Sequence, residues 1–188
     1  DALLFRDWLV KRGLTGSSVT RNFSYVKAVI NFAISEYALD LRNPFIGVYH
    51  DRTAGVLTRK PIPTEDIKAV QLACQRIDDD LRWLVALISD TGMRLGEAVG
   101  LLKQDIVLDG DVPYIDLKPH PWRRLKTSGS ERQIPLVGSS LWAARRVLDQ
   151  QSDSQFAFPR YCNHDYHNTN SASAALNKWL KGHAPKEC

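Results

Sequence analysis

Apolar residues recur at three- and four-residue spacing over residues 17–38, and this period predicts a helix with one face toward a core. The apolar positions are Val19, Phe23, Val26, Ile30, Ala33, Ile34 and Tyr37. Ser17 or Ser18 can cap the start of this helix, because a hydroxyl oxygen accepts from a free backbone N–H. Pro44 is a stop signal, since proline lacks a backbone donor and restricts the residue before it. A shorter amphipathic helix is predicted upstream, around Leu4–Leu9.

The periodicity breaks over residues 51–63, a polar, basic and proline-bearing stretch that we interpret as an interdomain linker. Thr64 can cap the next helix, and residues 81–89 form a strongly apolar helical segment. Three later stretches alternate like short strands bounded by Gly and Pro, namely DIVLDG, VPYIDLKP and RQIPLV. Two helical patterns follow, SLWAARRVLDQ and NSASAALNKWLKG. The expected fold is therefore α+β, mostly α with a small antiparallel β-sheet, in two domains at 1–50 and 64–188.

Composition narrows the partners of the protein only modestly. The 188 residues carry a formal net charge of +4 and a pI of about 9.0, which permits a nucleic-acid partner without requiring one. Cys74, Cys162 and Cys188 give an odd count without close pairing, so we expect no disulfide framework and a reducing cytoplasm. No apolar run approaches the ~20 residues of a membrane span, and no secretory signal opens the chain, so no membrane partner is expected.

Both ends of the sequence look cut. The first residues, DALLFRDWLVKRG, begin directly in an amphipathic pattern, and the last, KGHAPKEC, stop after a turn. We therefore expect this sequence to be part of a longer protein.

The stretch DTGMRLGEAVGLLKQDI, residues 90–106, places an arginine among apolar neighbours. Gly92 allows a tight entry, because glycine tolerates backbone angles that other residues avoid. We expect the apolar flanks to fix the direction of the Arg94 guanidinium and to desolvate it in part. Glu97, one turn on, can pair with Arg94 or brace it. The same spacing also fits a surface ion pair worth ~0.3–0.5 kcal/mol, and spacing alone slightly favours that explanation.

A second candidate is Lys126, in PWRRLKTSGSERQIPL between two predicted strands. Arg123, Arg124 and Arg132 cluster around it in sequence, and Ser128–Ser130 make the loop pliable. Such a loop can follow a sugar-phosphate backbone, although a lysine at a hairpin tip is normally just solvated.

The stretch CNHDYHN contains three residue types that bind metals, Cys162, His164 and His167. Their spacing matches no standard zinc pattern and no fourth ligand is evident, so we interpret the stretch as a polar loop and expect no metal. The sequence also has no phosphate-binding P-loop, no nucleophile elbow and no paired-carboxylate signature.

The stretch TGMRLGEAVGLLKQDI resembles the first conserved box of the tyrosine recombinases, the phage integrase family. That pattern is Thr-Gly-x-Arg-x-x-Glu, followed by a Leu and later by an Asp. The matching residues are Thr91, Gly92, Arg94, Glu97, Leu101 and Asp105. KTSGSERQIPL is similar to the family's β-hairpin with its catalytic lysine, which would be Lys126. FAFP, LRNPF and LTRKPIPTEDIKAV also resemble family segments, the last as the entry to the catalytic domain.

The resemblance implies a partial helical core-binding domain at 1–50 and the N-terminal part of a catalytic domain at 64–188. It implies site-specific DNA recombination or integration, in which a tyrosine attacks a backbone phosphate and forms a 3′-phosphotyrosyl link without metal or other cofactor. Arg94 and Lys126 would be catalytic and Glu97 supporting. The DNA-binding candidates, by charge and position, are Lys27, Arg59, Lys60, Arg123, Arg124 and Arg132. The implied partners are double-stranded DNA and further copies in a tetramer on DNA, at the nucleoid of a bacterial or phage-infected cell.

The family's second box, His-x-x-Arg, should follow the helix that contains Trp179, where this chain reads His-x-x-Lys at His183–Lys186. Tyr161 and Tyr166 lie upstream of the position of the nucleophilic tyrosine. We expect the missing groups beyond Cys188, and this chain alone to be inactive in strand cleavage. Two alternatives are a non-catalytic DNA-binding protein, such as an excision or regulatory factor, and a type IB topoisomerase-like enzyme. The downstream sequence tests the first alternative, and synapsis of two DNA sites tests the second.

Overall fold

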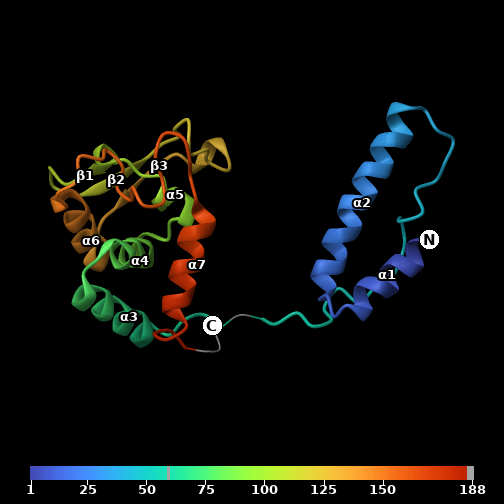
Figure 1. The fold of residues 1–188 in the computed structure, drawn as a ribbon, viewed down its shortest axis with the longest axis horizontal. Coiled ribbons are helices and arrows are strands. Elements are labelled where there is room, and N and C mark those ends of the chain that lie inside the picture. The colour runs from blue at the N-terminus through green and yellow to red at the C-terminus, as the bar shows by residue number, and fades with distance from the viewer. Residues whose placement is uncertain (59, 186–188) are drawn as a thin grey trace. The chain divides into compact units, whose positions relative to one another are not determined.

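The computed structural model describes residues 1–58 and 60–185. The chain divides into two compact units, Asp1–Arg59 and Lys60–Cys188 (Figure 1). Their boundary falls within the stretch predicted to be a linker, residues 51–63. No helix among the described residues combines the length and the apolarity that a membrane crossing requires.

Unit 1 contains two helices, α1 (Ala2–Lys11) and α2 (Gly16–Glu36). The cap of α2 is Thr15 rather than Ser17 or Ser18, because the Thr15 hydroxyl accepts from the Ser18 N–H at 3.3 Å. A small buried cluster joins the two helices and the chain that follows them. It consists of Leu9, Val19 and Phe23, with Phe5, Leu14, Phe45 and Val48 packed against it.

The predicted core face of α2 is buried only near the start of the helix. Val19 and Phe23 are buried, whereas Tyr37 is 71% exposed and lies just beyond the last helical residue, Glu36. The helix ends eight residues before Pro44, and Ala38 adopts a left-handed conformation with φ 45°. The stop signal is therefore local backbone geometry, and the expectation that Pro44 ends the helix is wrong.

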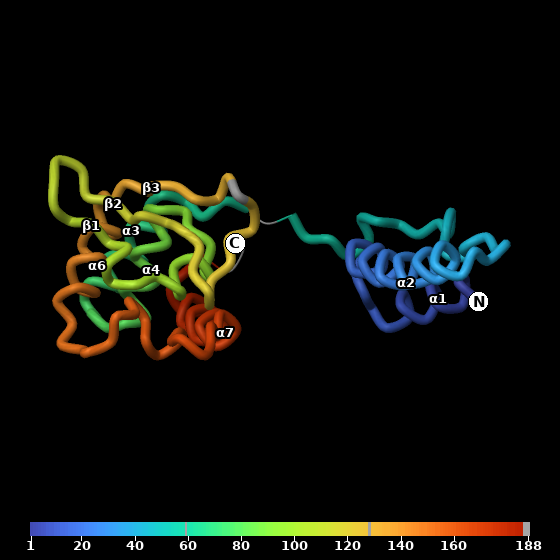
Figure 2. The backbone as a smooth tube through the Cα atoms, turned by 90° about the horizontal axis from the view of Figure 1, so that it is seen from above, coloured from blue at the N-terminus to red at the C-terminus, as the bar shows by residue number. Residues whose placement is uncertain are grey.

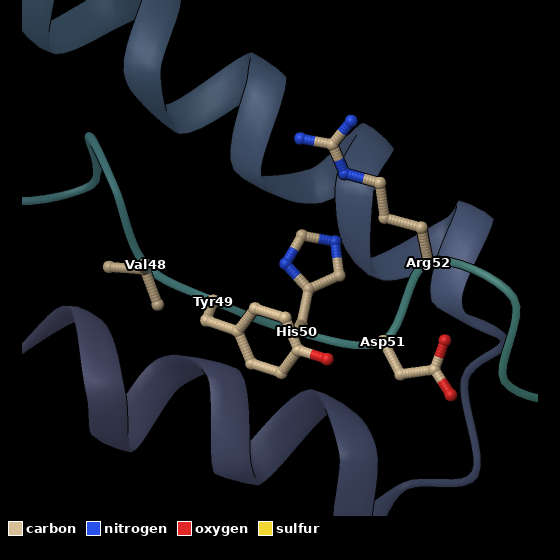
Figure 3. A pocket seen from close by; sticks show the side chains of 5 residues that line it. All are labelled: Val48, Tyr49, His50, Asp51 and Arg52. Carbon is tan, nitrogen blue, oxygen red and sulfur yellow. The ribbon is translucent and has the colours of Figure 1, made fainter.

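The first residues of the predicted linker pack on the start of α2. Gly16 donates its N–H to the Ala54 carbonyl at 2.7 Å, and a Cβ at position 16 would lie only 2.1 Å from the Asp51 carbonyl oxygen. Glycine is therefore required at this close approach. The neighbouring His50 bonds Thr20 of α2 through Nε2 at 2.7 Å. Figure 3 shows the hollow of about 340 Å³ that residues 48–52 line here.

Unit 2 contains five α-helices among its described residues. They are α3 (Thr64–Ile77), α4 (Asp80–Thr91), α5 (Leu95–Val99), α6 (Gly138–Asp149) and α7 (Thr169–Leu180). The apolar segment at 81–89 lies within α4, which packs against the other four helices and buries Leu84 and Leu87 completely. The predicted cap Thr64 is instead the first residue of α3, and Pro63 occupies the cap position without a side-chain hydrogen bond.

The predicted antiparallel sheet is confirmed, with strands β1 (Ile106–Val107), β2 (Tyr114–Leu117) and β3 (Arg132–Pro135). The strand order is β1-β2-β3, so β2 is central (Figure 2). Its register pairs Ile115 with Ile106 on one side and with Ile134 on the other. Every second residue of β2 is fully buried, which is the alternation that a sheet with one core face requires.

Asp78 joins three helices of unit 2. It follows the last residue of α3 in a left-handed conformation, with φ 55°. Its carboxylate accepts from Arg146 of α6 at 2.9 and 2.6 Å and from the Trp83 indole N–H of α4 at 2.7 Å. These hydrogen bonds, first of all those from Arg146, lower the pKa of Asp78.

Candidate active site around Glu97

The candidate site begins where α4 ends. Gly92 caps α4 with φ 61°, a left-handed angle that favours glycine. Arg94 then becomes the N-cap residue of α5, and its N–H donates to Glu97 Oε2 at 3.0 Å. The Arg94 guanidinium donates to Glu97 Oε1 at 2.7 Å. Glu97 therefore holds both the backbone and the side chain of Arg94.

A second guanidinium reaches the same carboxylate from the hairpin. Arg132, the first residue of β3, donates to Glu97 Oε2 at 3.2 Å and to the Ser130 carbonyl at 2.7 Å. Glu97 is only 4% exposed, so its charge is buried between the two cations. One carboxylate shared by two guanidinium groups leaves a local excess of one positive charge.

The buried member of the pair is Glu97, whereas Arg94 is only partly shielded from solvent. The Arg94 side chain is 57% exposed and the Arg132 side chain 38% exposed. Arg94 is fixed in direction, as expected, but through Glu97 rather than through apolar packing of its head. More than half of the Arg94 side-chain surface therefore remains open to a ligand.

The pKa of Glu97 lies below its ordinary value of 4.5. Burial is the largest single influence and raises the pKa, because it disfavours the charged form. The hydrogen bonds from the backbone and side chain of Arg94 and from Arg132 together outweigh it. Glu97 is therefore an anion at neutral pH.

Lys126 lies in the loop over residues 118–131, which connects β2 to β3 as predicted. Its side chain is exposed, and among the described residues no group accepts a hydrogen bond or ion pair from its ammonium. A hollow of about 250 Å³ adjoins it, lined by Pro119, Arg124, Leu125, Thr127 and Glu131. The Lys126 ammonium is thus available to a bound molecule.

Arg123 is not at the surface, so the prediction that it binds DNA is wrong. The residue is 1% exposed. Its guanidinium donates to the Glu97 carbonyl at 3.0 Å and to the Lys118 carbonyl at 2.5 Å, and lies 3.5 Å from Asp105. Burial lowers the pKa of Arg123, an effect that the Asp105 charge opposes. A buried guanidinium held in this way supports the fold and cannot reach a phosphate.

The other DNA-binding candidates are dispersed. Lys27 lies in α2 of unit 1 and is half-buried, and Lys60 is exposed at the start of unit 2. Arg124 is exposed beside Lys126, and Arg132 contacts Glu97 as described above. Arg59 lies outside the described residues.

Residues 120–123 form a tight turn that sequence reasoning missed. His120 and Arg123 exchange both backbone hydrogen bonds at 3.0 Å. The His120 ring bonds Asp105, which is fully buried, at 3.0 Å, and the Trp122 indole N–H donates to the Gly100 carbonyl at 3.2 Å. The available signal was the Pro-Trp pair in an otherwise basic loop, since a tryptophan seldom faces solvent alone.

The three potential metal ligands do not converge. The buried Cys162 thiol donates to the Asn163 carbonyl at 3.7 Å, and burial raises its pKa to about 11. His164 packs edge-on against Trp122 and Phe156, whereas His167 bonds the Gly96 carbonyl of α5 at 2.9 Å. The described residues contain no group of three or more His, Cys, Asp or Glu that could hold a metal ion.

Tyr161 is buried, and Tyr166 is exposed with its hydroxyl bonded to backbone carbonyls. Tyr161 is 1% exposed, its hydroxyl has no hydrogen-bond partner among the described residues, and burial raises its pKa. The Tyr166 hydroxyl donates to the Arg160 carbonyl at 3.2 Å. His183 stacks on Trp179 with ring centroids 4.2 Å apart, and Lys186 lies outside the described residues.

A family model described as the phage integrase family matches residues 62–186, which is more than half of the chain. The chain belongs to the phage integrase family. Its structure is similar to that of an integrase from the transposon Tn1549, solved in complex with circular intermediate DNA. The TM-score is 0.69 at 18% sequence identity, covering 100% of this chain and 67% of that chain. A sequence search of curated proteins gives no significant match.

Both family segments predicted to carry the site lie within the matched residues of this chain. Box one forms the α4–α5 junction, and the lysine hairpin forms the β2–β3 connection. They meet at Glu97, through Arg132 and Arg123. Family membership supports site-specific recombination as the general class of function, and the structural likeness supports the fold.

The first prediction concerns Glu97→Gln. We expect it to lower the free energy of unfolding at pH 7 by about 1.5–3 kcal/mol, because the hydrogen bonds lost involve a charged acceptor. The pKa of Glu97 is depressed by folding, so this contribution is present above 4.5 and is lost as pH falls through the folded value. Urea unfolding between pH 7 and pH 3 measures the difference in unfolding free energy between wild type and Glu97→Gln. This difference should become small at the lowest pH.

The control for this prediction is Glu65→Gln. Glu65 is 83% exposed and pairs with Lys68 at the surface, so its replacement should change stability little at any pH. A gap between wild type and Glu97→Gln that stays constant down to pH 3 would contradict the proposed charge on Glu97.

The second prediction concerns Gly100→Ala. A Cβ at position 100 would lie 2.7 Å from Cδ and 3.0 Å from Cβ of Arg123. Arg123 is pinned at its head and cannot move aside, so we expect a loss of about 1–3 kcal/mol from overpacking. Gly96→Ala is the matched control, because its nearest neighbour would be Thr169 Oγ1 at an ordinary 3.4 Å. Equal urea midpoints for the two variants would show that the Arg123 stem is not fixed.

Proposed function

We propose that the protein is an integrase-type recombinase that cuts and rejoins DNA strands through a 3′-phosphotyrosyl intermediate. The observation that carries this proposal is the Glu97 bridge. It joins the box-one arginine to the hairpin that bears Lys126, while leaving Arg94 more than half exposed. A plain surface ion pair would not bury its carboxylate or recruit a second guanidinium from the hairpin.

Arg94 would stabilise the charge that develops on the scissile phosphate. The transition state of phosphoryl transfer gathers negative charge on the phosphate oxygens, and preorganised cations oppose it. A guanidinium suits this task because it stays charged and donates two parallel hydrogen bonds to a phosphate. Arg132 donates to the same Glu97 carboxylate and adds to the positive electrostatic potential around Arg94.

Lys126 would act as the general acid. The departing 5′-oxygen needs a proton, which a lysine ammonium supplies far more readily than an arginine. The exposed Lys126 side chain has no partner among the described residues that would compete with this transfer. The nucleophile is not assigned, and Tyr161 is unsuitable because its hydroxyl is buried.

We propose double-stranded DNA as the partner and an assembly of several copies, in a tetramer, as the active form. The Tn1549 integrase was solved with DNA, and the present chain carries a net charge of +4. Unit 1 would be part of a helical DNA-binding domain, and unit 2 the N-terminal part of the catalytic domain. Arg124 and Lys60 are exposed candidates for phosphate contacts in unit 2.

The third prediction concerns Arg94→Lys in the full-length protein. Loss of one preorganised donor should slow strand cleavage about a hundredfold or more, because a lysine cannot donate the same paired hydrogen bonds. DNA affinity should change little. The measurement is the rate at which a covalent protein–DNA adduct accumulates on a suicide duplex. Arg145→Lys, at an exposed position of α6, is the control. Wild-type adduct formation by Arg94→Lys would remove Arg94 from the catalytic residues.

The fourth prediction concerns Lys126→Ala. We expect cleavage of the ordinary phosphodiester to slow about a hundredfold or more, since general acid catalysis is lost. A substrate with sulfur at the 5′-bridging position should restore the rate, because a thiolate leaves without a proton. Adduct formation on the two substrates is compared under the same conditions. Absence of rescue would refute the general acid role.

A further inference from the structure

The loop that carries Lys126 is attached to Glu97 on both of its sides. On the β3 side, Arg132 donates to the Glu97 carboxylate at 3.2 Å. On the β2 side, Arg123 donates to the Glu97 backbone carbonyl at 3.0 Å. Between these attachments the Thr127 and Ser130 hydroxyls share a hydrogen bond at 2.9 Å, and the Ser130 carbonyl accepts from Arg132.

We propose that Arg123 is a positioning residue, whose buried guanidinium fixes the Lys126 loop on α5 and so sets where the ammonium lies relative to Arg94. This inference rests on the proposed function, because it assigns Lys126 and Arg94 to one reaction. Arg123 does not touch the reacting atoms. It acts through the backbone of the loop.

The hydrogen bonds of Arg123 join α5 to the start of the loop that carries Lys126. One Nη donates to Glu97 in α5 and the other to Lys118, the residue that follows β2. The same guanidinium lies 3.5 Å from Asp105, which is fully buried next to β1. A single side chain thus ties the box-one helix to the point where the lysine loop leaves the sheet.

The turn at 120–123 holds this attachment rigid. Trp122 adds a hydrogen bond to the Gly100 carbonyl, and its ring stacks on His120 with centroids 4.9 Å apart. The absence of a side chain at Gly100 leaves the space that the Arg123 stem fills. Two neighbouring residues of the turn therefore dock on α5 and the residue after it.

The distance from this attachment to the lysine is short. Lys126 follows Arg123 by three residues, and an extended chain spans at most ~3.6 Å per residue, so the two Cα atoms lie within about 11 Å. A shift of the turn therefore displaces the start of the short backbone segment that leads to Lys126. A misplacement of about 1 Å at a catalytic group can cost about a hundredfold in rate.

The first experiment measures the position of the loop directly. Spin labels are attached to cysteines introduced at Thr127, beside Lys126, and at Arg145, on the exposed face of α6, in a Cys188→Ser background. Cys74 and Cys162 are buried, with thiol pKa values raised to about 12 and 11, so they react slowly with the label. We expect one narrow distance in this protein and a broadened or shifted distribution after Arg123→Met.

Two further variants keep this measurement interpretable. Arg76→Met removes an exposed arginine of α3 and should leave the distance distribution unchanged. Trp122→Phe removes the hydrogen bond to Gly100 and keeps an aromatic ring, although a smaller one, so it should broaden the distribution to a smaller extent. If Arg123→Met does not fold, as judged by circular dichroism, Trp122→Phe carries both experiments. An unchanged distribution in a folded Arg123→Met variant overturns the proposal, and where that variant does not fold an unchanged distribution in Trp122→Phe overturns it.

The second experiment measures the consequence for catalysis in the full-length protein. Adduct formation by Arg123→Met is compared on the ordinary suicide duplex and on the duplex with a 5′-bridging sulfur. We expect a loss of about a hundredfold on the ordinary substrate. On the sulfur substrate we expect a much smaller loss, as for Lys126→Ala. Equal losses on both substrates would mean that Arg123 supports the fold in general, and would overturn the proposal.

Failure of the inference and failure of the proposed function give different results. If sulfur rescues Lys126→Ala but not Arg123→Met, the general acid stands and the positioning role falls. If sulfur rescues neither variant, Lys126 is not the general acid. Arg123 then has no catalytic lysine to position. The spin-label distances would then still decide whether Arg123 fixes the loop.

Discussion

The buried carboxylate of Glu97 is the constraint on which the rest of unit 2's candidate site depends. A carboxylate that is 4% exposed is costly to bury unless cations and N–H donors compensate its charge. Here a backbone N–H and two guanidinium groups do so, and each comes from an element that the site must bring together. Burial of one charge therefore forces α5 and the start of β3 into a fixed relation.

A second buried charge, that of Arg123, fixes the β2 side of the hairpin in the same way. Arg123 is more deeply buried than Glu97, and Asp105, two backbone carbonyls and the surrounding turn compensate it. Removing one partner of such a set leaves an uncompensated charge, which is far more costly than losing a surface pair. The site thus gains geometric definition from groups that never face a ligand, whereas Arg94 and Lys126 stay exposed.

Much of the fold and part of the site could be predicted from the sequence. The apolar segment at 81–89 predicted α4, and the alternation around Ile115 predicted the sheet. Both patterns can be recognised in sequence because one face of each element is buried. Box one placed Arg94 beside Glu97, but spacing alone could not say which of the two is buried. That depends on Arg132, 35 residues away in sequence. Arg123 was misassigned to the surface for the same reason, since its partners lie on three segments that are separate in sequence.

The contrast between the two candidate catalytic groups follows from their chemistry. A group that stabilises charge is most effective when its position is fixed before the reaction, because no reorganisation is then needed at the transition state. Arg94 meets this condition through two hydrogen bonds to Glu97. A group that transfers a proton must approach the departing oxygen, and a strong partner in the free protein would hold it back. Lys126 meets that second condition because its loop is fixed at the base and its ammonium is left exposed.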